Sequence, residues 1–521
     1  MVYTLFTRID IAAGTPSARA NPRAGLDLMR SIQVVVPRII SLCTERHSMK
    51  RMGGVDSMML QMETPRAYQH TFKVAILDPS TDPEGWSFDK WRRDFEARIH
   101  LIPFFRWKYA PAPLGVNHPM WVDDPDFNLD YHMRRVACPA PGDHKALCEF
   151  MSSVYAYQLD RSRPLWMSWV VEGLQDGKIA VVTLVHHAYV DGVGAAWGLQ
   201  QLYKTEPGWQ PEAPPPWHPR PWPSWGKRLW WGLRDLPEVL SRNLPRVITG
   251  VRKKIELDKR FVAEGKNVPS AAMMQKTPIN EILSPGRTFV CKDMPLDDFK
   301  TVSKGLGVTI NDVFMACCAS AIRSFFKSRG YDPDQHPLVA GTPFAGKRPE
   351  DSPGVGNFTT MDYCWLPTNI EDPLERLHAA SKSATAMKEH LKICAEAGAD
   401  INSVMQVCPP WLMKALSWYI HSRKGAFSLF ANVVLSNVPG PREPIYLNRY
   451  KLDSWFSTGQ IVDGTCLNMT MWSYCGRANL CILIDKKVLD DGWQLYDAFV
   501  EELDRLVALV PQQQSSAEAS A

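Results

Sequence analysis

The sequence lacks the long apolar run of a membrane-spanning helix. Crossing the hydrocarbon core takes about 18 or more apolar residues, and the nearest stretch, residues 32–43, is interrupted by Pro37 and Arg38. The 12 cysteines include no C-x-x-C pair. In a chain of 521 residues this spacing favours reduced, buried thiols in the cytoplasm over a disulfide framework or a zinc site.

A large net charge is also missing, because 59 basic residues face 55 acidic ones and leave a formal charge of +4. Overall charge therefore gives no support to a nucleic-acid-binding protein. The chain is 45% hydrophobic and 22% charged, which is ordinary for a globular protein and excludes disordered, collagen-like and coiled-coil chains. Its length predicts two or three domains.

Charge and proline are unevenly distributed along the chain. Residues 1–52 carry eight basic and three acidic side chains, without the apolar segment and cleavage site of a signal peptide. We expect an extension of no set function, or a translation start at Met49 or Met52, and a targeting segment is the alternative. Residues 207–223 contain eight prolines, which predict a stiff, extended linker.

The segment that follows this linker is basic and rich in tryptophan. Residues 227–260 hold ten basic side chains against four acidic ones, and six tryptophans lie between positions 209 and 231. This composition favours a helix on an anionic membrane surface, with Trp225, Trp230 and Trp231 at headgroup depth. The alternative is an inter-domain helix with a solvated basic face.

Elsewhere, expected strands and helices alternate, which predicts an α/β fold. Apolar runs rich in β-branched residues predict strands at 72–77 and 179–185. Helical spacing of apolar residues predicts helices at 145–157 and 311–327. A hairpin is expected over residues 467–484, and a helix is expected to start with Asp372 as its cap.

The most informative segment is VVTLVHHAYVDGVGAAW, residues 181–197, in which an apolar strand ends at two adjacent histidines. Neighbouring side chains on a strand point to opposite sides, so one of His186 and His187 faces a cavity and the other packs inward. Histidine is the usual general base at neutral pH, and Asp191 could hold the loop or orient the ring. From these residues alone, two packed histidines beside a structural turn are the favoured explanation. The segment supplies too few ligands for a metal, and none is expected.

HHAYVDG, residues 186–192, fits the HHxxxDG motif of the CoA-dependent acyltransferase superfamily. Further blocks resemble those of the bacterial wax ester synthase/diacylglycerol acyltransferase family in the same order, and the resemblance covers about residues 56–508. One departure is GTPFAGKR, residues 341–348, which stands where the family usually has a PVSxR-like block. The resembling blocks are DSMMLQME (56–63), DFNLDYHMRR (126–135), LDRSRPLW (159–166), VTINDVF (308–314), GVGNF (354–358) and LSNVPGP (435–441).

The resemblance implies an α/β (α+β) fold of two chloramphenicol-acetyltransferase-like domains with a central channel. It implies that His187 is the general base that takes the hydroxyl proton of a long-chain alcohol or diacylglycerol, whose oxygen attacks the thioester of acyl-CoA. His186 would give structural support, Asp191 would pair with an arginine, and Gly192 would permit a tight turn. Acyl-CoA is then a co-substrate, and no cofactor or metal is expected.

Weaker candidates complete the predicted site. Asn311 is a possible polar stabiliser of the tetrahedral centre, with a helix N-cap as the alternative. Ser473 is a weaker candidate for the same task, and a strand serine without a role is the alternative. Pro164, Leu165 and Trp166 are expected to shape the fold and the channel mouth without taking part in the chemistry.

Three alternative functions stay open: a condensation-type enzyme acting on carrier-protein thioesters, a short-chain acyltransferase, and an inactive lipid-surface-binding protein on the same fold. The expected partners are acyl-CoA, the acceptor and a lipid droplet or membrane surface in the cytoplasm, with no nucleic acid. Product preference and oligomeric state stay open. The expected divisions are a basic extension (1–52), an N-terminal acyltransferase domain (53–206), a Pro/Trp-rich basic linker (207–285), a C-terminal acyltransferase domain (286–510) and a polar tail (511–521).

Overall fold

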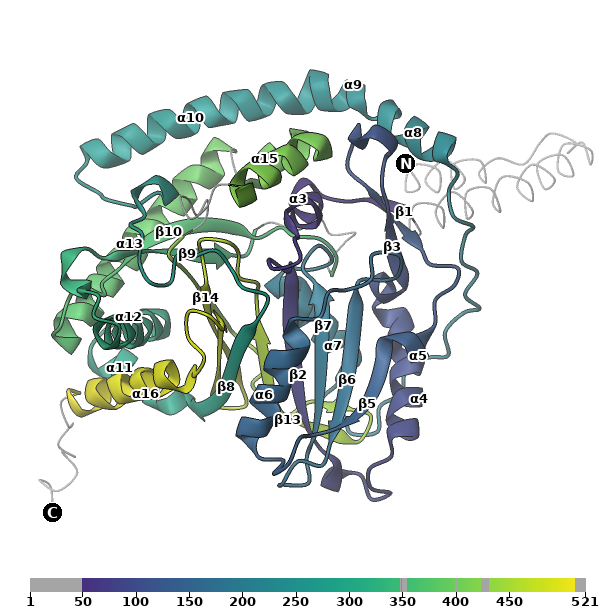
Figure 1. Ribbon diagram of the computed structural model, residues 1–521, viewed down its shortest axis with the longest axis horizontal. Coiled ribbons are helices and arrows are strands. Elements are labelled where there is room, and N and C mark those ends of the chain that lie inside the picture. Colours follow the sequence, from purple (N-terminus) through teal and green to yellow (C-terminus); the bar gives the residue numbers. More distant parts are fainter. Residues whose placement is uncertain (1–48, 347, 349–353, 399–400, 423–430, 511–521) are drawn as a thin grey trace, which may run out of the picture. The chain divides into compact units, whose positions relative to one another are not determined.

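The computed structural model describes residues 49–346, 348, 354–398, 401–422 and 431–510. Most of the predicted basic extension and all of the predicted polar tail lie outside these residues. Residues 51–521 form one compact unit, and the description below concerns this unit. Two six-stranded sheets organise it (Figure 1).

The first sheet carries the histidine motif at the end of one of its central strands. Its order is β12-β13-β2-β7-β6-β5, and β2, β7 and β6 are antiparallel neighbours that are almost wholly buried. Burial on both faces explains why these strands read as near-continuous apolar runs. The strands span Met133–Ala137 (β5), Trp166–Glu172 (β6), Ile179–His186 (β7), His70–Asp78 (β2), Tyr450–Thr458 (β13) and Tyr446–Leu447 (β12).

Helices of the first half of the chain cover this sheet, as the purple and blue ribbons of Figure 1 show. A short antiparallel pair, β3 with β4, lies beside them. The bounds are Met49–Arg51 (β1), Gly54–Met62 (α3), Phe88–Arg98 (α4), Trp107–Ala110 (β3), Met120–Asp123 (β4), Leu129–His132 (α5), His144–Tyr155 (α6) and Gly192–Leu202 (α7).

The second sheet has the order β10-β9-β11-β14-β15-β8. One of its faces packs on helices α11, α12, α13 and α16 in a core of its own. Side chains alternate between the faces of a strand. Val290 of β8 therefore lies in that core, while Phe289 and Cys291 face the core around the first sheet. The bounds are Arg287–Pro295 (β8), Leu296–Gly305 (α11), Ile310–Ser328 (α12), Leu338–Phe344 (β9), Thr360–Leu366 (β10), Pro373–Ala397 (α13), Ile401–Val407 (α14), Pro410–Ser422 (α15), Val433–Val438 (β11), Leu467–Tyr474 (β14), Arg477–Asp485 (β15) and Trp493–Ala508 (α16).

One late segment of the chain belongs to the first sheet. Strand β13 pairs antiparallel with β2, so that Lys451 lies opposite Asp78 and Thr458 opposite Phe72. The order of the elements along the sequence does not predict this exchange. The first sheet is therefore completed by a strand that comes after most strands of the second sheet in the sequence.

The local predictions are confirmed. The expected strands at 72–77 and 179–185 lie in β2 and β7, and the expected helices at 145–157 and 311–327 correspond to α6 and α12. The hairpin β14–β15 turns at Cys475 and Gly476, which both have positive φ, 46° and 78°.

The Pro-rich segment 207–223 contains no helix or strand, and the basic region after it is helical. Its elements are Trp225–Arg234 (α8), Leu236–Glu238 (α9), a π-helical turn at Val239–Asn243 and Leu244–Ala263 (α10). His390 of α13 holds α10 through Asp258, at 2.9 Å, and contacts Asp362 of β10 at 2.7 Å. Within the described part of the chain no single helix meets the length and hydropathy of a membrane span; α11 and α12 do so only together, bent by 106°.

Candidate active site

Strand β7 delivers the two histidines to the end of the first sheet. The His186 amide donates to Leu165 O at 2.9 Å, and the His187 amide donates to Gln69 O at 2.7 Å, so the backbone is bound on both sides. A turn then leads to α7, whose first residue is Gly192. The side chains of adjacent residues therefore leave a fixed backbone in different directions.

His186 is fully buried in a polar cluster with Glu63 and His70. Its Nε2 lies 3.8 Å from Glu63 Oε2, and His70 Nε2 lies 3.3 Å from Glu63 Oε1. Burial raises the pKa of Glu63, but the two histidines outweigh that effect and hold it well below its usual range. His186 therefore packs inward, against a charged carboxylate.

His187 lies deep in the fold, yet part of its surface stays exposed. Its pKa is lowered to about 4, mainly by burial and in addition by the nearby charge of Lys73, while Asp191 opposes the change. Its Nδ1 is buried and has no hydrogen-bond partner within the described residues. At neutral pH the ring is thus unprotonated and can accept a proton from a bound molecule.

An apolar cavity lies beside the histidine motif, because Val185 and Val190 on either side of the histidines line it, although His187 itself does not. Part of the cavity is open to solvent, and the space inside it that a water-sized sphere can reach is about 90 Å³. The walls come from β2, β7, α4 and α7, with Trp455 of the exchanged strand β13. Such a lining accepts a hydrocarbon chain.

Lys73 brings a positive charge into this apolar cavity. It belongs to β2, and its Nζ donates to Ser457 Oγ of β13 at 2.7 Å. Burial lowers the pKa of Lys73 to about 8, because desolvation disfavours the ammonium form. Lys73 was not predicted as a site residue, although a lysine inside an otherwise apolar strand is a usable signal.

Asp191 caps α7 and binds the second half of the chain. Its Oδ1 accepts from the Gly194 amide at 2.9 Å and its Oδ2 from the Phe358 amide at 2.9 Å. Its partner arginine is Arg348, which forms an ion pair with Oδ1. Arg348 lies within GTPFAGKR, the block that departs from the family pattern.

A second set of hydrogen bonds, behind His187, joins three of the sequence blocks: 56–63, 186–192 and 354–358. Asn357 Nδ2 donates to the His187 carbonyl and to Asp56 Oδ1, both at 2.7 Å, and the Asn357 amide donates to the same Asp56 oxygen at 2.8 Å. Burial raises the pKa of Asp56 to about 6. The neighbouring Gly356 has a φ of 94° and donates to Tyr189 O at 2.7 Å, which explains glycine at that position.

The tight-turn explanation for Gly192 is wrong. The residue is helical and is absent from the glycines with positive φ, and an added Cβ would meet only Val438 Cγ2, at 3.9 Å. The N-cap alternative for Asn311 is also wrong, because Thr309 caps α12 and forms a capping box with Asp312. Asn311 instead donates to Met315 Sδ at 3.4 Å.

The remaining candidates lie in structural positions. Ser473 Oγ accepts from the Gly440 amide at 3.2 Å and so braces the turn after β11. Leu165 and Trp166 are fully buried beside the histidine strand, and Trp166 stacks between Phe105 and His132. Neither residue borders the cavity, and Pro164 is buried next to them. These three positions hold β6 against the end of β7.

Comparisons with known proteins place this arrangement in context. The family model of the wax ester synthase/diacylglycerol acyltransferase catalytic domain matches residues 52–314, and that of the WS/DGAT C-terminal domain matches residues 355–507. A putative diacylglycerol O-acyltransferase of Mycobacterium tuberculosis H37Rv is 46% identical over 463 residues, 88% of this chain and 97% of the relative. A second from the same strain is 33% identical and covers 88% of this chain and 90% of its own length.

Two solved structures share the fold. The wax ester synthase/diacylglycerol acyltransferase from Marinobacter aquaeolei VT8 has a TM-score of 0.61 at 24% identity, covering 88% of this chain and 98% of its own. The starter condensation domain of rhizomide synthetase has a TM-score of 0.53 at 11% identity, covering 90% and 97%. The predicted fold class is thereby confirmed.

We expect Lys73→Met to raise the pKa of His187. Lys73 is charged below about pH 8, so its repulsion is fully present in the acid range where His187 titrates, and removing it favours the imidazolium. The measurement is the NMR titration of histidine-labelled protein, with the His187 signal assigned by its loss in His187→Gln. Lys178→Met is the matched control, because Lys178 lies before the opposite end of β7. An unchanged titration in Lys73→Met would show that the ammonium does not act on this ring.

Proposed function

The chain belongs to the wax ester synthase/diacylglycerol acyltransferase family and is an acyltransferase; from this premise we propose that it transfers a fatty acyl group from acyl-CoA to the hydroxyl of a long-chain alcohol or diacylglycerol. The observation that carries the proposal is the unprotonated, part-exposed His187 beside an apolar cavity. Together they supply a base for the hydroxyl and a place for a hydrocarbon chain.

In the proposed reaction His187 takes the hydroxyl proton as the oxygen attacks the thioester carbonyl. The C–O bond forms, the C–S bond breaks, and His187 returns the proton to the departing CoA thiolate. A positioned general base contributes about 10²–10⁴-fold. We include no covalent enzyme intermediate, cofactor or metal in this reaction. Each methylene buried in the cavity adds about 0.8 kcal/mol to substrate binding.

The surface supports a second part of the proposal, that the enzyme works on a lipid surface. Trp225 and Trp230 of α8 are each 57% exposed, and Trp418 of α15 is 73% exposed. Helix α15 packs on α3 and exposes further apolar side chains that were not predicted from the sequence. Trp231 is only 7% exposed, so its predicted insertion at headgroup depth is wrong.

A direct assay tests the transfer. Purified protein with labelled palmitoyl-CoA is expected to esterify hexadecanol and dioleoylglycerol, with products read by thin-layer chromatography. A short-chain alcohol and an acyl-carrier-protein donor serve as comparison substrates. Preference for either comparison substrate would favour the short-chain or condensation-type alternative, and no product with any substrate would favour the lipid-binding one.

The two histidines are expected to differ in their variants. His187→Ala should lose about 10²–10⁴-fold in turnover with an unchanged melting temperature. His186→Ala should lower the melting temperature, because a buried carboxylate with fewer partners costs about 1–3 kcal/mol. Circular dichroism and the transfer assay measure the two effects. Equal losses of turnover at full stability in both variants would contradict the assigned roles.

We expect binding to anionic vesicles at low salt and release near 0.5 M salt, where the Debye length falls to a few ångströms. Each basic residue near such a surface contributes about 1 kcal/mol. Arg246, Arg252 and Lys259 are exposed on α10, and changing all three to Gln should weaken co-sedimentation. Lys254 is left unchanged because it pairs with Asp258 at 2.8 Å.

The matched control changes three exposed lysines away from α10, Lys292, Lys304 and Lys327, to Gln. It has the same charge loss and should bind vesicles like the wild type. If both variants bind vesicles equally weakly, the effect is due to net charge and not to α10. If the wild-type protein does not bind anionic vesicles at low salt, α10 is only an inter-domain helix.

A further inference from the structure

A histidine and two cysteines meet on the side of the first half that faces β8, away from the histidine motif. His144 and Cys148 lie four residues apart in α6 and so share one face of that helix. Cys291 comes from β8 of the second sheet. One potential ligand atom from each residue lies within 4.8 Å of the others.

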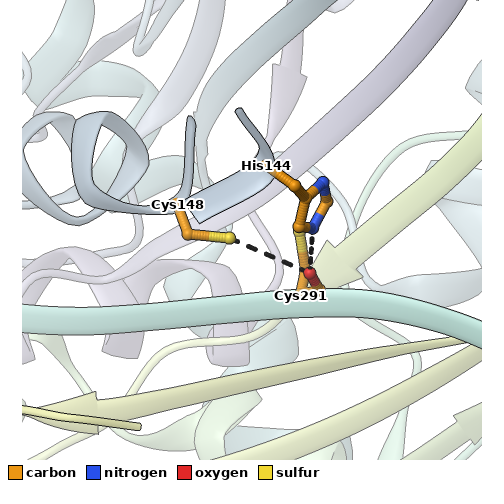
Figure 2. A group of neighbouring side chains, drawn as sticks. All are labelled: His144, Cys148 and Cys291. Atoms are coloured by element: carbon orange, nitrogen blue, oxygen red, sulfur yellow. Dashed lines mark hydrogen bonds between the residues drawn. The ribbon is translucent and has the colours of Figure 1, made fainter. Parts of the chain in front are cut away.

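The alternating direction of side chains along β8 explains why Cys291 belongs to this group of three residues. Side chains along a strand point to opposite faces, and Phe289 and Cys291 face the core that contains α6, while Val290 faces the other core. Figure 2 shows His144 and Cys148 directed at the carbonyl oxygen of Cys291. His144 Nε2 is hydrogen-bonded to it, and Cys148 Sγ lies 3.8 Å from it.

We propose that His144, Cys148 and Cys291 bind a zinc ion that bridges the two halves of the fold. Thiolate and imidazole are the ligands that Zn²⁺ prefers, at about 2.3 Å for sulfur and 2.0–2.1 Å for nitrogen. A tetrahedral ion of these bond lengths holds its ligand atoms roughly 3.3–3.8 Å apart. The observed separations, all within 4.8 Å, therefore need shifts of up to about 1.5 Å to reach the bond lengths of zinc.

The surroundings provide an entry path. His144 lines a cavity that also contains Asp143, Asp176, Asp293 and Asp453 against the single Lys178. Arg477 pairs with Asp293 at 2.6 Å, so two negative charges remain uncompensated around the cavity, and these attract a divalent cation. Cys148 and Cys291 are buried beneath His144, so the ion enters past the imidazole, and a water from the cavity side completes its coordination.

This zinc would be structural and takes no part in the acyl transfer. It would connect helix α6 to strand β8, and so add a bond between the two halves to the hydrogen bonds and the ion pair that Asp191 already makes. No metal site was predicted from the sequence, because no closely spaced set of ligands stands in it. Here the third ligand lies more than a hundred residues from the other two and reaches them through the fold.

The test uses the full-length protein, stripped with a chelator under reducing conditions, incubated with one equivalent of Zn²⁺ and desalted. We expect about one zinc per chain by mass spectrometry of the metal, and a higher melting temperature than without zinc. The double variant Cys148→Ser/Cys291→Ser should retain almost no zinc and show no such shift. Its matched control is Cys394→Ser, which removes a thiol from a second group, Asp258, His390 and Cys394, and should retain zinc.

Two further measurements apply if the double variant does not fold. His144→Gln, at the cavity rim, should weaken zinc binding by about 10-fold or more. Wild-type protein loaded with Co²⁺ should show thiolate-to-cobalt charge-transfer absorption, which carboxylate ligands cannot produce. Zinc loss in Cys394→Ser, full retention in His144→Gln, absence of the cobalt band, or a Cys148–Cys291 disulfide in place of bound metal would each overturn the proposal.

Discussion

The candidate site depends on Asp191, a buried carboxylate that must find a partner for each of its oxygens. One oxygen accepts a hydrogen bond from the Gly194 amide in the first turn of α7, and the other accepts one from the Phe358 amide in the second half of the chain. Arg348 compensates the negative charge. A buried charge without such partners costs several kcal/mol. The position of α7, and with it the turn that presents His187, is therefore coupled to the packing of the two halves.

Two adjacent histidines acquire different properties from their surroundings alone. His186 lies in a sealed pocket against Glu63, where its contacts stabilise the fold. His187 keeps part of its surface exposed, and desolvation together with repulsion from the charge of Lys73 keeps it neutral. Within the HH motif, the buried His186 thus holds the backbone in place, and this sets the direction of His187, the proposed base.

The sequence predicted what depends on local periodicity or on an unbroken motif. Strands β2 and β7 and helix α12 follow from their apolar spacing, and the position of His187 at the end of β7 follows from the motif. It could not predict that β13 joins the first sheet, because pairing with β2 is set by packing between residues nearly 400 positions apart. Arg348, Asn357 and Lys73 were missed for the same reason, since each acts through a contact across the fold.

The pairing of β13 with β2 also affects the chemistry of the site. Ser457 of β13 accepts a hydrogen bond from Lys73 and so holds its ammonium inside an apolar cavity, where burial already favours the neutral amine. That charge lowers the pKa of His187. A residue late in the chain thereby helps to keep the base unprotonated, and the exchange couples correct assembly of both halves to the readiness of the site.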